Sequence, residues 1–176
     1  MPTFIALLRG INVAGQKKVP MAALREVLTK SGLEQVRTYI QSGNVIFEAN
    51  NKNTQQLAED IHKSIKAYFG FEVPILIKTP TQLQQILDAC PFPETQKQNS
   101  YFSLLYATPR QELIDEVSTI KYPNETVSIT KNCIYFYCSA GYGRTKYNNN
   151  FFERKLNVTA TARNYKTMVK LLSLSQ

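Results

Sequence analysis

The order of its strand and helix patterns restricts the fold of this chain more than any other feature of its sequence. In the first half, the short apolar runs typical of strands span residues 3–8, 36–40, 45–48 and 73–77. Apolar residues at helical spacing follow Pro20 and continue to Gly32, and a second helical pattern runs from Asn53 to Gly70. The resulting β-α-β-β-α-β order is that of the split βαβ, or ferredoxin-like, arrangement.

Local signals add detail to this prediction. Gln41-Ser42-Gly43-Asn44 separates the second and third strands, and its glycine tolerates the positive φ that a tight turn requires. Asn53 is a predicted N-cap, with Gln56 as its capping-box partner. The buried stripe of the helix that follows is predicted to consist of Leu57, Ile61, Ile65 and Tyr68.

The same order begins again in the second half of the chain. A strand, a helix and a hairpin are predicted at 101–107, 111–120, 126–130 and 133–138. We therefore expect an α+β fold of two ferredoxin-like lobes with antiparallel-mixed sheets and a C-terminal helix. The predicted boundaries are a lobe and short helix at 1–90, a linker at 91–100, and a lobe with a basic helical tail at 101–176.

Three helix starts are predicted from capping residues. Thr79-Pro80-Thr81-Gln82 and Thr108-Pro109-Arg110-Gln111 both combine a threonine N-cap, a proline in the first turn and a glutamine three residues after the cap. The last helix is predicted within 159–174, with Thr161 as its N-cap. This start places Arg163 and Asn164 in the first helical turn.

Composition favours an anionic partner and a reducing compartment. The net charge is +8, and residues 131–176 contain eight basic residues and one acidic residue. Such asymmetry favours a polyanion, a phosphorylated ligand or an acidic surface as partner, although a basic protein can also be one that is charged for solubility. The three cysteines include no C-x-x-C pair and are expected to be free thiols. The sequence also has no apolar run long enough to predict a membrane span. We therefore expect a cytoplasmic protein.

The best candidate site combines two loops. Residues 9–20 form an unusually long strand-to-helix connection with glycines, an amide and two lysines. In the split βαβ order its start lies at the same sheet edge as the hairpin at residues 41–44. Guanidinium groups have the geometry to bind phosphate, and amide side chains can form hydrogen bonds with the edge of a nucleobase. Alternatively, the amides and Arg9 brace the loops by binding backbone carbonyl groups. The predicted ligand-binding residues are Arg9, Gly10, Asn12, Lys17, Lys18, Gln41, Ser42, Gly43, Asn44, Arg163 and Asn164.

Other reaction classes have little support in the sequence. No pair of carboxylates has the spacing of a hydrolase site, the lone His62 has no nucleophile beside it, and no metal or cofactor is expected. Gly141-Tyr142-Gly143-Arg144-Thr145-Lys146 lacks the spacing of a phosphate loop, so a turn is the better interpretation.

Three segments resemble a known family. Leu7–Gly10 with Ile11-Asn12-Val13 and Lys18-Val19-Pro20-Met21, then Thr38–Val45, then Thr161–Thr167, are similar to the bacterial domain-of-unknown-function family 1697. Ala14, where glycine is common, and Tyr165, where tryptophan is common, depart from its pattern. The resemblance implies a two-lobe α+β fold and supplies no reaction.

Three functions follow as hypotheses. The first is binding of a phosphate-bearing ligand, either a nucleotide or a nucleic acid, in the loop cleft. The second is a metal-independent enzyme that acts on a small phosphorylated or amide-containing substrate in the same cleft. The third is a protein-interaction module with a basic docking tail. The sequence leaves open whether the chain is an enzyme, and it does not indicate an oligomeric state.

Overall fold

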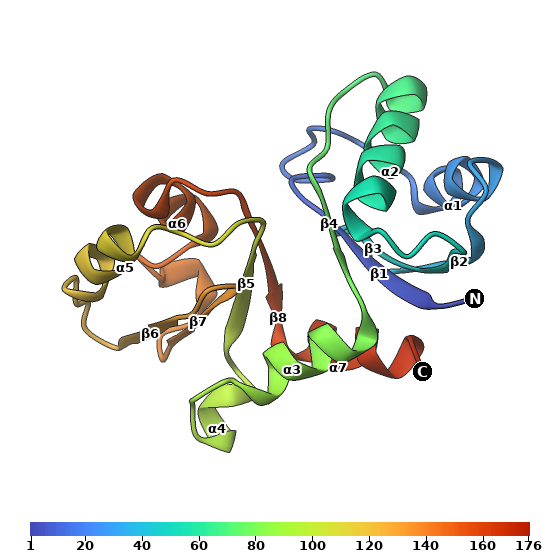
Figure 1. Cartoon of the computed structure of the whole chain (residues 1–176). Coiled ribbons are helices and arrows are strands. Elements are labelled where there is room, and N and C mark those ends of the chain that lie inside the picture. Colours follow the sequence, from blue (N-terminus) through green and yellow to red (C-terminus); the bar gives the residue numbers. More distant parts are fainter. The chain divides into compact units, whose positions relative to one another are not determined.

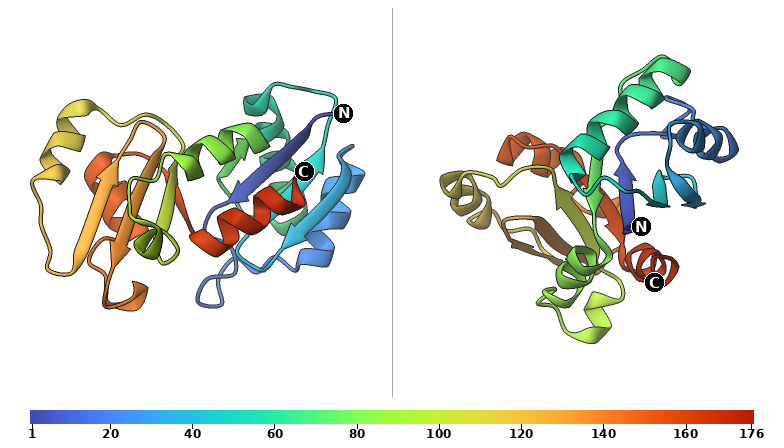
Figure 2. Two further views of the ribbon diagram at one scale, coloured as in Figure 1. Left: turned by 90° about the horizontal axis from the view of Figure 1, so that it is seen from below. Right: turned by 45° about the vertical axis from the view of Figure 1, so that its right-hand side comes forward.

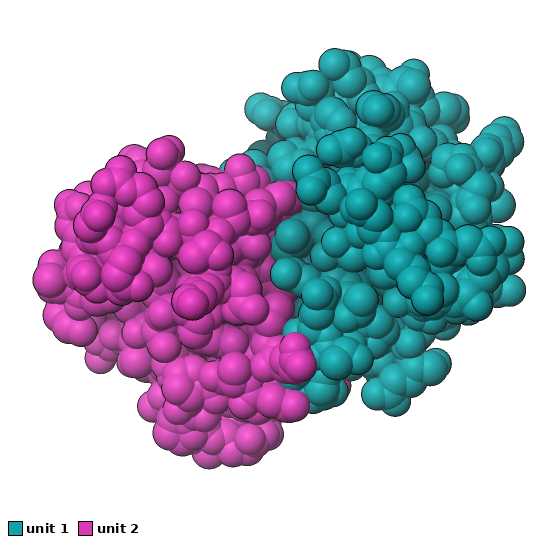
Figure 3. All heavy atoms as spheres, viewed as in Figure 1, with its two compact units in different colours: residues 1–84, 170–176 teal, residues 85–169 magenta.

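The computed structural model describes residues 1–176 and divides into two compact units (Figures 1 and 3). Unit 1 comprises residues 1–84 and 170–176, and unit 2 comprises residues 85–169. The α-helices are α1 (Met21–Lys30), α2 (Thr54–Phe69), α3 (Pro80–Asp88), α4 (Glu94–Lys97), α5 (Gln111–Ser118), α6 (Asn149–Leu156) and α7 (Tyr165–Leu174). The strands are β1 (Thr3–Leu8), β2 (Glu34–Tyr39), β3 (Asn44–Glu48), β4 (Ile75–Lys78), β5 (Tyr101–Leu105), β6 (Glu125–Ile129), β7 (Cys133–Cys138) and β8 (Ala160–Asn164).

Unit 1 contains a four-stranded antiparallel sheet in the order β2-β3-β1-β4. Strand β3 returns between β1 and β2, as the element order predicts, so β1 ends at the edge of the sheet where the β2–β3 hairpin lies. Helices α1 and α2 pack on one face of the sheet (Figure 1). The core between helices and sheet includes Phe4, Ala6, Leu8, Leu24, Leu28, Val45, Phe47, Leu57, Ile61 and Ile65.

Unit 2 repeats this architecture with its own sheet in the order β6-β7-β5-β8, again with every pair antiparallel. Helices α5 and α6 contribute Val117, Phe151, Phe152 and Leu156 to its core. Both units therefore have the order β-α-β-β-α-β, with the third strand beside the first. The predicted α+β class is confirmed as two four-stranded antiparallel sheets, rather than antiparallel-mixed ones.

The last strand of unit 2 corrects the predicted start of the last helix. Residues 160–164 form β8, which pairs with β5 in the register Leu104↔Thr161 and Phe102↔Arg163. Thr161 is thus a strand residue and not an N-cap, and α7 begins only at Tyr165. Alternating threonine and alanine side chains favour a strand once β5 offers an unpaired edge, so tertiary pairing overrides the helical interpretation.

Helix caps are confirmed at α3 and in part at α2. At α3, Thr79 Oγ1 accepts from the Gln82 amide at 3.1 Å, and Gln82 Oε1 accepts from the Thr79 amide at 3.0 Å. At α2, Asn53 Oδ1 accepts from the Gln56 amide at 3.0 Å, but the Gln56 side chain binds Asp60 instead of completing the box.

Two further predictions about elements, those on Thr108 and Tyr68, are wrong in detail. Helix α5 begins at Gln111 with Arg110 in the N-cap position and no side-chain cap, so Thr108 does not start it. Tyr68 is 64% exposed and lies outside the buried stripe of α2. The segment 91–100 contains the short helix α4. None of the helices is long and apolar enough to cross a membrane.

The turn at Gly43 yields a test of the packing at the end of β1. Gly43 has φ +92°, and a Cβ atom there would lie 2.6 Å from Leu8 Cβ; Gly32 has φ +100° and open space around it. We predict that Gly32→Ala costs about 1–2 kcal/mol of unfolding free energy through backbone strain alone. Gly43→Ala should cost about 1–3 kcal/mol more, because Leu8 or the turn must also move. Urea unfolding of both variants checks this difference, and equal costs would show that the turn is not packed against Leu8.

Candidate functional site

The connection between β1 and α1, residues 9–20, has an unusual backbone. Positive φ values occur at Gly10 (75°), Asn12 (55°), Ala14 (50°), Gly15 (74°) and Lys17 (46°). The Gln16 amide donates to the Val13 carbonyl at 2.9 Å, which closes a tight turn with both central residues left-handed. In the left-hand view of Figure 2, the loop lies at the end of β1 opposite the N-terminus. Ala14 sits where glycine would be unstrained.

Asn12 joins this loop to the β2–β3 hairpin. Its Nδ2 group donates to the Gln41 carbonyl at 2.8 Å and to the Val19 carbonyl at 3.0 Å. Its Oδ1 atom accepts from the Val19 amide at 2.8 Å. Asn12 and Gln41 are 29 residues apart in the chain, so the two loops meet as the strand order predicts. We call residues 9–18 and 41–44 together the loop edge.

The second amide of the loop edge also has a bracing role. Asn44 is fully buried, and its Nδ2 group donates to the Tyr39 carbonyl at 3.0 Å and to Ser42 Oγ at 2.9 Å. Asn12 and Asn44 thus make the contacts that the alternative interpretation of the sequence describes. The backbone carbonyl oxygen of Gln41 accepts the hydrogen bond from Asn12, and Gln41 is exposed to solvent.

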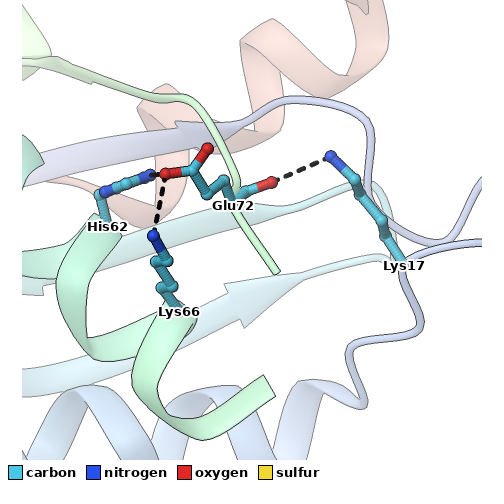
Figure 4. Close-up of polar contacts among 4 residues, drawn as sticks. All are labelled: Lys17, His62, Lys66 and Glu72. Carbon is cyan, nitrogen blue, oxygen red and sulfur yellow. Dashed lines mark hydrogen bonds and ion pairs between the residues drawn. The ribbon is translucent and has the colours of Figure 1, made fainter. Parts of the chain in front are cut away.

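The cations of the loop edge come before and after Asn12 in the sequence. The backbone amide of Arg9 is bonded to the Pro74 carbonyl at 3.1 Å, and its side chain is partly exposed. Lys17 and Lys18 are exposed, and Lys17 Nζ donates to the Glu72 carbonyl oxygen at 2.9 Å (Figure 4). Lys17 is therefore held near the segment between α2 and β4.

The Glu72 carboxylate is engaged by α2 rather than by the loop edge. It lies 3.2 Å from Lys66 Nζ and 4.0 Å from His62 Nε2 (Figure 4). The hydrogen bond from Lys66 and the charges of Lys66 and His62 lower the pKa of this carboxyl group, with a smaller effect from Lys17. His62 thus lies at the surface beside the Glu72 carboxylate, in line with its predicted surface or boundary position.

The two remaining predicted site residues belong to unit 2. Arg163 is 6% exposed, and its guanidinium group donates to Thr161 Oγ1 at 2.7 Å and to the Ala162 carbonyl at 2.8 Å. Burial lowers its pKa to about 10, so the group stays charged at neutral pH. Asn164 Oδ1 accepts from the Thr167 amide at 2.9 Å and caps α7. These Arg163 bonds lie within β8 itself, and Asn164 caps the helix that follows; phosphate binding by Arg163 stays a prediction.

The glycine-containing segment 141–146 is a turn, as the sequence favours. It includes the 3₁₀ turn η1 (Tyr142–Arg144). The Glu125 carboxylate accepts from the amides of Lys146 at 2.7 Å and Tyr147 at 3.2 Å, and from the Thr145 hydroxyl group. A carboxylate of the protein itself therefore accepts from three of the donors at the end of this turn.

The structure also contains a pocket that the sequence analysis did not predict as a whole. A pocket of about 310 Å³ in unit 2 is lined by residues that include Tyr101, Tyr137 and Lys166. Asn164, one of the predicted ligand-binding residues, also lines this pocket, and it lies with Lys166 in the 161–167 segment. No group of three or more His, Cys, Asp or Glu side chains is placed to hold a metal ion.

The brace at Asn12 can be tested with a matched pair of glycine variants. Asn12→Gly keeps the left-handed backbone but removes three hydrogen bonds, so it should cost about 2–3 kcal/mol of unfolding free energy. Ala14→Gly removes strain in the same loop and should be neutral or stabilise the protein by up to about 1 kcal/mol. Urea unfolding measures both, and hydrogen exchange at the Val19 amide should accelerate only in Asn12→Gly. Unchanged exchange at Val19 would contradict the brace.

Comparison with known proteins places the chain in a family. Its fold resembles the structure of a conserved bacterial protein from Streptococcus pneumoniae, with 27% sequence identity, a TM-score of 0.75, and coverage of 99% of this chain and 98% of that one. None of the curated proteins compared with the chain matches it. The model of a family described as "Protein of unknown function (DUF1697)" matches residues 1–135. The chain therefore belongs to the DUF1697 family.

Proposed function

We propose that unit 1 binds a phosphate-bearing ligand, a nucleotide or a nucleic acid, at the loop edge. The observation that supports this most is the Asn12 brace, which holds Arg9, Lys17 and Lys18 in one loop against the hairpin at Gln41. A loop whose position is already fixed loses little conformational entropy when a ligand binds. In this proposal the amides brace the loop and the cations contact the ligand.

The charge around the loop edge supports an anionic ligand. The first 25 residues contain four basic residues and no acidic residue. Lys17 contacts the backbone carbonyl of Glu72, an acidic residue. The Glu72 carboxylate itself lies beside Lys66 and His62. An approaching phosphate would therefore meet ammonium and guanidinium groups without a competing carboxylate from the loop itself. Each well-placed charge-assisted hydrogen bond contributes about 1.5–3 kcal/mol.

We assign a role in binding to each residue from its contacts. Arg9, Lys17 and Lys18 are the phosphate contacts, and the exposed carboxamide of Gln41 is the group that reads a base or another amide-like edge. Asn12 and Asn44 act as positioning residues, because their own amides are bonded within the loops.

Two finer features belong to the same proposal. We assign both units to the ferredoxin-like class, which is supported by their shared element order and by the placement of the third strand beside the first. We also place the protein in the cytoplasm, since Cys90, Cys133 and Cys138 are buried free thiols, which suit a reducing compartment.

The test compares two variants of similar charge change. Arg9→Gln/Lys17→Gln/Lys18→Gln removes the proposed contacts, whereas Lys52→Gln/Lys63→Gln removes two exposed cations elsewhere in unit 1. Binding of fluorescent nucleotides, single strands and duplexes is measured by anisotropy. We predict that the first variant loses at least about tenfold in affinity, and that the second stays close to the parent protein.

Salt separates the two kinds of ligand. Three phosphate contacts on a single strand give a slope of about −2, so affinity should fall about 20-fold between ~50 and ~200 mM salt. A mononucleotide should depend much less on salt. Absence of binding across the panel, or equal affinity of the two variants, would overturn the proposed function.

A further inference from the structure

Unit 2 contains a pocket that has no counterpart in the proposed function. Its volume is about 310 Å³, and it opens where β5 begins and where β7 and β8 end. These three strand ends meet because neighbouring strands of the sheet are antiparallel. The lining residues used below are Tyr101, Tyr137, Asn164 and Lys166.

The pocket lining is rich in hydrogen-bond donors. Lys166 supplies an ammonium group, and Tyr101 and Tyr137 supply hydroxyl groups; none of these three groups bonds to another part of the chain. Asn164 uses its Oδ1 atom to cap α7, which leaves its NH₂ group as the available part of the amide. The lining contains one cation and no carboxylate. This balance of groups suits an acceptor with negative charge.

One wall of the pocket is held rigidly. The Tyr101 ring lies 5.5 Å from the Phe136 ring and 4.5 Å from the Tyr142 ring, measured between centroids. These contacts fix the Tyr101 ring before any ligand arrives, so binding costs little side-chain entropy there. The ring also offers a flat apolar surface beside its hydroxyl group.

We propose that this pocket binds a small organic oxyanion, that is, a phosphate monoester or a carboxylate with a compact planar body. Lys166 and the tyrosine hydroxyl groups bind the oxyanion, and the Tyr101 ring contacts the body of the ligand. The volume lies at the lower end of ligand pockets, which suits a metabolite rather than a polymer. Lys166 is also in the first turn of α7, where the helix dipole favours negative charge.

This site is independent of the loop edge. In unit 1 the loop edge follows the end of the first strand, β1, whereas in unit 2 the pocket lies at the start of the corresponding strand, β5. The two proposals thus concern opposite ends of the repeated sheet, and either one can fail while the other stands.

The experiment uses calorimetric titration of the full chain with phenyl phosphate, benzoate and uncharged benzyl alcohol. Lys166→Gln removes the pocket cation, and Lys170→Gln is the matched control on the same helix, exposed and outside the pocket. We expect at least one oxyanion to bind, with about tenfold weaker binding in Lys166→Gln and parent-like binding in Lys170→Gln. Tyr137→Phe should also weaken binding, and the loop-edge triple variant should not.

The probes distinguish the ligand classes. Binding of phenyl phosphate alone identifies a phosphate monoester site, and binding of benzoate as well identifies a general oxyanion site. The proposal is overturned if neither oxyanion binds at about 20 mM, a concentration well above millimolar dissociation constants. It is also overturned if Lys166→Gln binds as tightly as Lys170→Gln, or if benzyl alcohol binds as tightly as benzoate.

Discussion

The carboxamide of Asn12 is the interaction on which the proposed binding site depends. It satisfies both polar groups of Val19 and the Gln41 carbonyl oxygen, and so it ties the β1–α1 loop to the β2–β3 hairpin. The residue adopts φ +55°, a conformation that asparagine tolerates better than most residues. Other contacts also hold the long loop, such as that of the Arg9 amide with the Pro74 carbonyl and that of Lys17 with the Glu72 carbonyl, but the Asn12 side chain is the group that bonds it to the hairpin.

Both units have the same order of strands and helices, and the long loop of the loop edge occurs only in unit 1. In unit 1, residues 9–20 connect the first strand to its helix, but in unit 2 residues 106–110 suffice for the equivalent connection. Both sheets place the end of the first strand beside the hairpin between the second and third strands. Unit 2 lacks the long cationic loop at that edge, and it has a polar pocket at the other end of its sheet. The two units thus share a fold and differ in the loop and the pocket from which the two proposals are argued.

Much of the fold could be predicted from the sequence, because its periodic patterns are local. The strand at Thr3–Leu8, the turn at Gly43 and the cap at Thr79 follow from the residues themselves. Strand β8 was missed because its pairing with β5 depends on a segment about 60 residues away in the chain. The meeting of the two loops was predictable from strand order, but the bonding partners of Asn12 and Asn44 were not, since an amide has the same identity whether it braces a loop or faces a ligand. Of the pocket of unit 2, the sequence analysis predicted Asn164 alone as a binding residue, because the lining comes from several separate segments.

The most direct test of the central claim is an amide chemical-shift map of the protein during titration with a nucleotide or short single strand that binds. The structure predicts that shifts concentrate at residues 9–18 and 41–44, and that Val19 responds through its bonds to Asn12. Control amides on the exposed side of α2, such as that of Lys63, should not shift. Shifts that bypass the loop edge, or saturating binding with no response at either loop, would contradict the account.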